Sequence, residues 1–369
     1  YIFRLFYKEN FVSLRIMPMF AALFLPDQML LIRILAAFLT ALAVVLACGG
    51  RFIAFLHGCQ GLGQPIRENG PQSHLLTKKG TPTMGGILIL AAIIVSSLLW
   101  CSLSNLFVWL CLAVILVFGA TGFADDYVKV KKHTPDAMTA KMKLLLQFVT
   151  AFAVVWLVTA NTSENLRFSL VVPYVNRIFD LWWLYLPFAM VVIAGTSNAV
   201  NLSDGLDGLA GGLCLTAFSA FGVIAFTTAF PETVNFRSVL IPECGEVAVV
   251  CAAAAGACLG FLWFNAYPAQ MFMGDVGSLG FGGVLAFLAV LCKQELLLLI
   301  VGGLFVAETL SVILQVSYFK ASGGKRIFRM APLHHHYEMK GIPESKIIIR
   351  FWIISIMLGL IALSALKLR

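Results

Sequence analysis

The sequence predicts an all-α polytopic membrane protein with about ten transmembrane helices. Of its 369 residues, 60% are hydrophobic and only 12% are charged, and the mean hydropathy is +0.92. An ordinary soluble domain has about 25% charged residues. Because apolar side chains this abundant are accommodated only in a bilayer, the composition excludes soluble, disordered and disulfide-scaffold proteins.

Ten apolar segments each approach the roughly 20 residues that a helix needs to cross the hydrocarbon core of a bilayer. They lie at residues 28–48, 83–100, 106–124, 143–160, 181–198, 206–229, 247–264, 277–291, 296–318 and 347–366. Glycine-rich stretches among them fit close packing between helices. We therefore expect one helical bundle over residues 28–369, with both chain termini on the same side.

The first 27 residues mix apolar side chains with charged ones and lack a small-residue cleavage site. For residues 1–27 we therefore expect an interfacial segment rather than a signal peptide. The nine cysteines are scattered singly, without a CxxC pair, which is typical of small buried apolar residues.

Basic residues predict the orientation of the bundle. Loops after the first, third and ninth segments contain about fifteen Lys and Arg residues, whereas the opposite loops contain about four. Cytoplasmic loops carry the excess of Lys and Arg, so these loops are expected in the cytoplasm and both termini in the periplasm. By alternation, the loops after the fifth and seventh segments are cytoplasmic too. This grouping also explains the net charge of +8 without a nucleic-acid partner.

The unusual polar residues fall on these five expected cytoplasmic loops, which indicates one site assembled from separate loops. In the first loop, KKGTPTMGG at residues 78–86, Lys78 and Lys79 precede a Gly-Thr-Pro turn that opens the second segment. Free backbone N–H groups at a helix start attract anions. The lysines could equally be only a topology anchor.

In the second loop, residues 122–143, Asp125 and Asp126 stand at the cytoplasmic end of the third segment. Carboxylates at membrane depth are costly unless they are paired or bind a metal. Lys129 could simply pair with Asp125 at i,i+4. Because adjacent helical residues point about 100° apart, one lysine cannot satisfy both acids, which favours a divalent cation or a proton-transfer role for the other.

The third loop, residues 198–212, repeats polar residues at every third position: Asn198, Asn201, Asp204 and Asp207. A helical or 3₁₀ turn would align them on one ridge, and the interleaved glycines leave room for a ligand. The spacing does not fit an EF-hand calcium loop.

The fourth loop, residues 264–283, places Asp275 at the entry to the eighth segment, where a simple helix-cap role is the alternative. Beside it, Phe272 offers a flat face for a base or sugar, and Asn265 offers an amide. The fifth loop, residues 320–346, contains three consecutive histidines, 334 to 336. Consecutive imidazoles cannot all face one zinc ion, so a platform for phosphate is the better interpretation.

Taken together, five acids, several lysines and a histidine triplet at one membrane face suit a magnesium-bound diphosphate. Walker A, GxSxG and HExxH motifs are absent from the sequence. A membrane transporter is the alternative from another class, because intramembrane acids and glycine-broken helices also mark transport sites. Transport would favour polar residues near the middle of the bilayer and internal repeats, and neither is evident.

Four segments, FADDYVKV, NAVNLSDGLDGLAGG, NAYPAQMFMGDVGSLGFGG and MAPLHHHYEMKG, resemble the phospho-N-acetylmuramoyl-pentapeptide transferase family. That family belongs to the polyprenyl-phosphate N-acetylhexosamine-1-phosphate transferase superfamily. The resemblance extends from about residue 28 to the C-terminus, and GTPTMGG and RIFRMAPLHHHYE look specific to this branch. The loop MAPLHHHYE argues against the sister branch, which transfers GlcNAc-1-phosphate. A departure such as Ser203, where Thr is expected, removes no charged group.

The resemblance implies transfer of phospho-MurNAc-pentapeptide from UDP-MurNAc-pentapeptide to undecaprenyl phosphate, giving lipid I and UMP, the first membrane step of peptidoglycan synthesis. It implies a Mg²⁺ cofactor, a homodimer, and a location in the bacterial cytoplasmic (inner) membrane with the active site facing the cytoplasm. Residues 28–369 would then form a single transmembrane transferase domain.

The resemblance also implies roles for individual residues. The implied magnesium ligands are Asp275 and Asp126. The implied catalytic residues are Asp125, Asp126, Asp275, His334, His335 and His336, with Asp125 as the candidate base. The implied uridine pocket contains Asn201, Gly205, Leu206, Asp207 and Phe272, and Asp204 is a further implied substrate-binding residue. The remaining implied substrate contacts are Lys78, Thr83, Lys129, Lys141, Asn265 and Gln315.

A phosphate monoester has its second pKa near 6, so undecaprenyl phosphate is mostly dianionic at pH 7 and needs little deprotonation. Direct attack on the diphosphate is therefore favoured over a two-step route through a phosphorylated aspartate.

Overall fold

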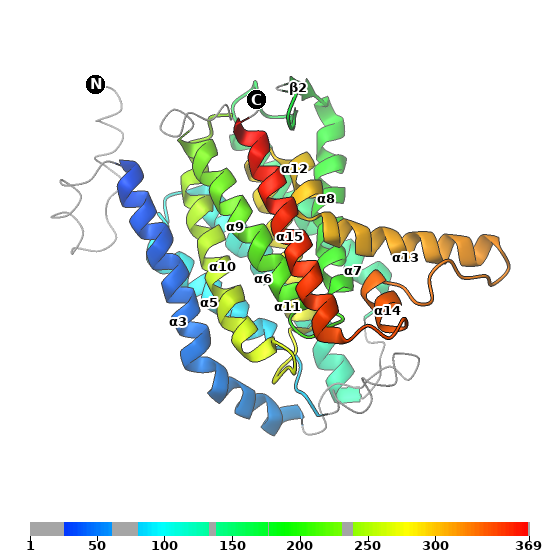
Figure 1. The fold of residues 1–369 in the computed structure, drawn as a ribbon. Coiled ribbons are helices and arrows are strands. Elements are labelled where there is room, and N and C mark those ends of the chain that lie inside the picture. The colour runs from blue at the N-terminus through cyan, green and yellow to red at the C-terminus, as the bar shows by residue number, and fades with distance from the viewer. Residues whose placement is uncertain (1–25, 61–79, 133–137, 176, 231–238, 368–369) are drawn as a thin grey trace, which may run out of the picture.

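The computed structural model describes residues 26–60, 80–132, 138–175, 177–230 and 239–367. Helices account for most of this chain (Figure 1). In chain order the long ones are α3 (Pro26–Gln60), α5 (Gly86–Trp100), α6 (Leu106–Lys132), α7 (Ala140–Asn161), α8 (Tyr185–Ser203), α9 (Leu209–Ala229), α10 (Cys244–Asn265), α11 (Gly274–Leu291), α13 (Gly303–Ala321) and α15 (Glu344–Lys367). The short ones are η1 (Trp182–Leu184), α12 (Glu295–Val301) and α14 (Leu333–Glu338).

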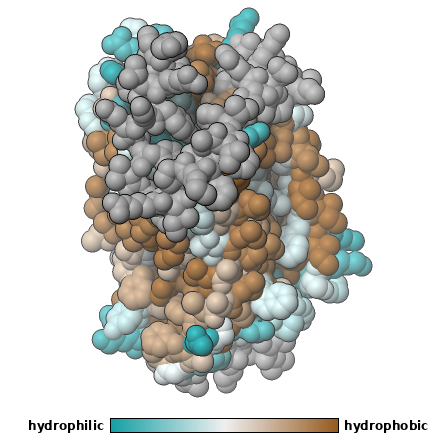
Figure 2. Space-filling view, turned by 90° about the vertical axis from the view of Figure 1, so that its left-hand side faces the viewer, coloured by the Kyte–Doolittle hydropathy of each residue, from teal (hydrophilic) through white to brown (hydrophobic). Residues whose placement is uncertain are grey.

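Nine helices within the described ranges are long and apolar enough to cross a membrane, and α5 is a shorter apolar helix of 15 residues. Each of the ten predicted segments overlaps one of these ten helices. The prediction of an all-α polytopic membrane protein is therefore confirmed, whereas the side on which the termini lie stays a prediction. Figure 2 shows apolar side chains over much of the middle of one face, as expected for a surface that meets lipid.

The ninth predicted segment, 296–318, is not one straight helix. It is divided into α12 and α13 at Gly302, and Figure 1 shows α13 leaving the bundle at a steep angle. Two consecutive glycines, Gly302 and Gly303, weaken the helix here because glycine carries the largest backbone entropy cost in a helix. Hydropathy alone detects the apolar residues but not this change of direction.

The sequence analysis also did not predict the β-hairpin between α7 and α8. Strand β1 (Ser169–Val172) pairs antiparallel with β2 (Arg177–Asp180), with Ser169 opposite Asp180 and Val172 opposite Arg177. Its four-residue strands are too short to give a strong alternating pattern. In Figure 1 the hairpin lies at the upper end of the bundle, where α3 begins and α15 ends.

Helices α10 and α11 form the centre of the bundle, with α10 packed against α3 and α9, and α11 packed against α6 and α8. The close approach of α6 to α11 depends on Gly122, because a Cβ at this position would overlap the carbonyl oxygen of Asp275. The missing side chain thus brings the end of α6 against the first turn of α11. This contact positions the carboxylates of the candidate site.

Candidate active site

Three carboxylates from two helices meet at this contact. Asp125 and Asp126 come from the last turns of α6 and Asp275 from the first turn of α11. One oxygen of each lies within 4.8 Å of one oxygen of each of the others. Gly274, which precedes Asp275, has a φ of +73° and faces Asp126, so a side chain there would be strained and would collide with that carboxylate.

Two lysines bridge the three acids. Lys129 Nζ lies 2.6 Å from Asp125 Oδ2 and 3.0 Å from Asp275 Oδ2. Lys143 Nζ lies 2.7 Å from each of the same two oxygens. The i,i+4 pairing of Lys129 with Asp125 that the sequence suggested is therefore present, but it belongs to a larger network.

The donor set of this network fits a divalent cation. Three carboxylates and two ammonium groups meet in this cluster. The buried Asp126 Oδ1 has no hydrogen-bond partner within the described part of the chain. Magnesium characteristically uses one or two protein carboxylates together with substrate phosphates. Asp126 and Asp275 can supply those carboxylates.

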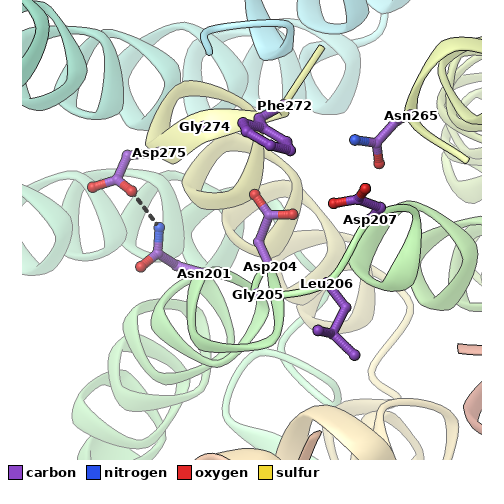
Figure 3. A pocket seen from close by; sticks show the side chains of 9 residues that line it. All are labelled: Asn201, Asp204, Gly205, Leu206, Asp207, Asn265, Phe272, Gly274 and Asp275. Atoms are coloured by element: carbon purple, nitrogen blue, oxygen red, sulfur yellow. Dashed lines mark hydrogen bonds between the residues drawn. The ribbon is translucent and has the colours of Figure 1, made fainter. Parts of the chain in front are cut away.

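A pocket adjoins the carboxylates and shares Asp275 with them (Figure 3). It is lined by Asn201, Asp204, Gly205, Leu206, Asp207, Asn265, Phe272, Gly274 and Asp275. All of these except Gly274 were predicted as site residues. Asn201 Nδ2 donates to Asp275 Oδ1 at 2.9 Å and to Ser278 Oγ at 2.9 Å, which connects the pocket to the carboxylates.

Two loops form opposite sides of this pocket, and their polar side chains tie them together. The Gly208 N–H donates to Asn265 Oδ1 at 3.0 Å, and Asn265 Nδ2 donates to the Met271 carbonyl at 2.9 Å. The Ala269 N–H donates to Asp207 Oδ2 at 3.0 Å. Asn265 and Asp207 therefore shape the pocket as well as line it.

Helix α15 supports the same loop from behind. The Asp207 N–H donates to Glu344 Oε1 at 2.9 Å. The sequence analysis did not single out Glu344 within the fifth loop, because its partner Asp207 lies well over a hundred residues earlier in the chain. Only the tertiary fold brings the two residues together.

The loop before α5 is joined to the Phe272 segment through its backbone. Gly85 N–H donates to the Phe272 carbonyl at 2.8 Å, and Phe272 N–H donates to the Pro82 carbonyl at 2.8 Å. Thr83 lies between them, 1% exposed, and its Oγ1 faces the same side of Gly274 as the Asp126 carboxylate. Lys78, the other predicted residue of this loop, is outside the described residues.

The three histidines point to three different partners. The His334 N–H donates to Glu308 Oε1 at 3.2 Å, and His335 Nδ1 lies 2.6 Å from Glu338 Oε2. His336 Nδ1 accepts a hydrogen bond from the Arg329 N–H at 3.1 Å. Burial, and then the nearby cations of Lys340 and Arg329, lower the pKa of His336 below its ordinary value. This divergence agrees with the expectation that the histidines do not converge on one ion.

Two residues that were predicted to contact the substrate, Lys141 and Gln315, lie away from the carboxylates. Lys141 is exposed in the first turn of α7, and Gln315 Oε1 accepts hydrogen bonds from the Ile327 and Phe328 N–H groups, which orders that loop. Lys143, which does enter the site, was missed. A signal was available, because the buried Gln147 is four residues further on and marks the inward face of α7.

A carboxylate cluster beside a pocket at one end of an apolar helical bundle defines a polytopic membrane enzyme, and comparisons with known proteins identify the class. Residues 108–293 match the model of glycosyl transferase family 4. Residues 78–90 match phospho-N-acetylmuramoyl-pentapeptide-transferase signature 1.

Curated relatives match along nearly the whole chain. The phospho-N-acetylmuramoyl-pentapeptide-transferase of Nitratidesulfovibrio vulgaris is 55% identical over 335 residues, covering 90% of this chain and 92% of the relative. That of Solidesulfovibrio magneticus is 54% identical over 339 residues, covering 91% and 93%. That of Desulfotalea psychrophila is 49% identical over 340 residues, covering 92% and 94%. The chain belongs to the phospho-N-acetylmuramoyl-pentapeptide transferase family.

Proposed function

We propose that this protein transfers phospho-MurNAc-pentapeptide from UDP-MurNAc-pentapeptide to undecaprenyl phosphate, forming lipid I and UMP. The observation that carries this proposal is the sharing of Asp275 between the carboxylate cluster and the pocket. A nucleotide held in the pocket would place its diphosphate beside Asp275. Phe272 supplies a flat face for the base, and the loop at residues 204–208 supplies polar groups around it.

Asp275 and Asp126 would hold magnesium, which supplies neutralisation of the diphosphate charge when it is bound. The chain itself contributes two further cations, the ammonium groups of Lys129 and Lys143. These groups hold the carboxylates in one arrangement. Such preorganised charges stabilise the transition state of phosphoryl transfer, which depends more on positioning and electrostatics than on covalent catalysis by the protein.

A single displacement fits the chemistry of the acceptor. Undecaprenyl phosphate is mostly dianionic at neutral pH, so Asp125 needs to remove a proton only from the minor monoanionic form. A radiolabelled phospho-sugar enzyme formed without acceptor would contradict this route and favour a two-step mechanism. We also propose that the site faces the cytoplasm of the bacterial inner membrane, as the basic loops indicate, and that the protein is a homodimer, as the resemblance implies.

The deciding experiment measures UMP release by the purified protein in detergent, with UDP-MurNAc-pentapeptide, undecaprenyl phosphate and Mg²⁺. UDP-GlcNAc serves as the parallel donor, and Asp275→Asn, checked for folding by thermal unfolding, serves as the site variant. Magnesium-dependent release from the muramoyl donor alone, lost in the variant, supports the proposal. Release only from UDP-GlcNAc would place the protein in the sister branch. If a folded preparation releases UMP from neither donor, the result would favour the transporter hypothesis.

A further inference from the structure

A buried carboxylate and imidazole pair lies behind the pocket, outside the residues that line it. Glu308 on α13 and His334 on α14 are both fully buried. Glu308 Oε1 accepts the His334 N–H at 3.2 Å, and Glu308 Oε2 lies 3.3 Å from His334 Nδ1. One oxygen of the carboxylate therefore accepts a hydrogen bond from the His334 backbone, and the other lies close to the ring of the same histidine.

The opposite edge of the His334 ring faces the pocket loop. A Cβ added to Gly205 would overlap His334 Nε2, so the ring lies directly against the backbone of this loop. Within the described residues, neither nitrogen of the His334 ring nor Glu308 Oε2 has a hydrogen-bond partner, so Glu308 acts on the ring through its charge at 3.3 Å. The ring thus connects α13 to the loop at residues 204–208 by direct contact.

The carboxylate also selects the arrangement of protons on the ring. A carboxylate beside Nδ1 favours the proton on that nitrogen, which leaves Nε2, the nitrogen that faces Gly205, without a proton. In the other tautomer, Nδ1 and Glu308 Oε2 would both be acceptors, and a buried acceptor pair without a proton is unfavourable. Glu308 therefore fixes both the position and the tautomer of His334.

We propose that Glu308 is a positioning residue for the nucleotide pocket. It acts through His334, whose ring sets the position of the Gly205 backbone and thereby the shape of the pocket for the base and sugar of the donor. This inference rests on the proposed function, because it takes the pocket as the nucleotide site.

The first test is Glu308→Gln, which keeps the size of the side chain and one oxygen acceptor but removes the charge that selects the tautomer. We expect UMP affinity to fall about tenfold and KM for UDP-MurNAc-pentapeptide to rise about tenfold, because the carboxylate charge that acts on the His334 backbone N–H and ring is removed. KM for undecaprenyl phosphate should stay within about twofold of the parent value. Glu308→Asp keeps the charge and should restore part of the affinity.

The matched control is Glu246→Gln, which removes the charge from a Glu that pairs with Arg33 at the other end of the bundle. It should lower the melting temperature without changing UMP affinity. If Glu308→Gln behaves in the same way, Glu308 is only structural and the inference is wrong.

A double variant tests whether Glu308 acts through His334. Glu308→Gln combined with His334→Asn should weaken UMP binding no more than His334→Asn alone, because the histidine through which Glu308 acts is already gone. Additive losses would overturn the inference. UMP affinity is measured by calorimetry without turnover. A wild-type protein that binds UMP but transfers nothing would therefore refute the proposed function while the variants still decide the role of Glu308.

Discussion

Lys143 on α7 pairs with Asp275 on α11 at 2.7 Å, and the same ammonium group reaches Asp125 on α6. Three helices that are separate in sequence are thereby joined at the carboxylates. Without this cation, Asp125 and Asp275 would face each other with less compensation of their charge. Lys143 consequently has both a structural and an electrostatic role in the site.

Replacing Lys143 with Met should lower the rate of UMP release by about 10- to 100-fold, because one charge-assisted interaction with each of Asp125 and Asp275 is lost. Radiolabelled lipid I formation measures the effect. Lys132→Met, which changes an exposed lysine at the end of α6, should remain within about twofold of wild type. A Lys143→Met protein with normal activity would show that Lys129 alone is sufficient.

Gly122→Ala should separate α6 from α11. The added methyl group would overlap the Asp275 carbonyl, and relieving this overlap must move a backbone rather than a flexible side chain. Overpacking of this kind costs about 1–3 kcal/mol and would displace the carboxylates relative to one another. We expect reduced activity and a lower melting temperature in detergent. Gly195→Ala, where a Cβ meets nothing within 4 Å, is the matched control and should keep full activity.

Sequence reasoning predicted most of the bundle because hydropathy and span length are local properties. It found the segments that became α3, α6 and α10, and it found Asp275 and the pocket residues because charged and polar groups are conspicuous in an apolar chain. The features that it missed depend on the direction in which a helix runs or a side chain points. The division at Gly302 and the choice of Lys143 over Lys141 are set by helix packing, which a hydropathy pattern does not encode.

Supporting residues were harder still to predict. Glu308, Glu344 and Gln60 each act on a loop remote from them in sequence. Glu308 and Gln60 belong to no polar cluster, and Glu344 is one of many polar residues in the fifth loop. A buried polar residue in an apolar helix signals that some partner exists, but identifying the partner requires the fold.

Gln60, the last residue of α3, should matter for the loop that contains Thr83. Its amide donates to the Thr83 carbonyl at 2.9 Å and accepts the Thr83 N–H at 3.0 Å. Gln60→Ala would leave two buried backbone groups unpaired, at a cost of about 2–3 kcal/mol. We expect a lower melting temperature and reduced transfer activity. Asn161→Ala, which removes an exposed amide that donates to the Leu157 carbonyl within α7, should change the unfolding free energy by less than about 0.5 kcal/mol.

At the end of the bundle away from the carboxylates, a cation and an acid are buried around one tyrosine. Lys293 Nζ lies 3.8 Å from the centre of the Tyr185 ring and donates to the Arg167 carbonyl at 3.2 Å, while the Tyr185 hydroxyl donates to Glu295. Burial raises the pKa of Glu295 to about 6, against the lowering effect of Lys293 and the tyrosine. Burial also lowers the pKa of Lys293 to about 8.

Lys293→Met should therefore destabilise the protein in a pH-dependent way. Removing the cation raises the Glu295 pKa further, and leaving a buried charge without compensation costs about 3 kcal/mol at neutral pH. An acid with a raised pKa contributes stability below its unfolded pKa, and that contribution is lost as pH rises through the folded pKa. The melting temperature of the variant in detergent should thus fall further below wild type at pH 8 than at pH 5. Adding Glu295→Gln should recover much of the loss, and an equal deficit at both pH values would mean that Glu295 carries no charge in the folded protein.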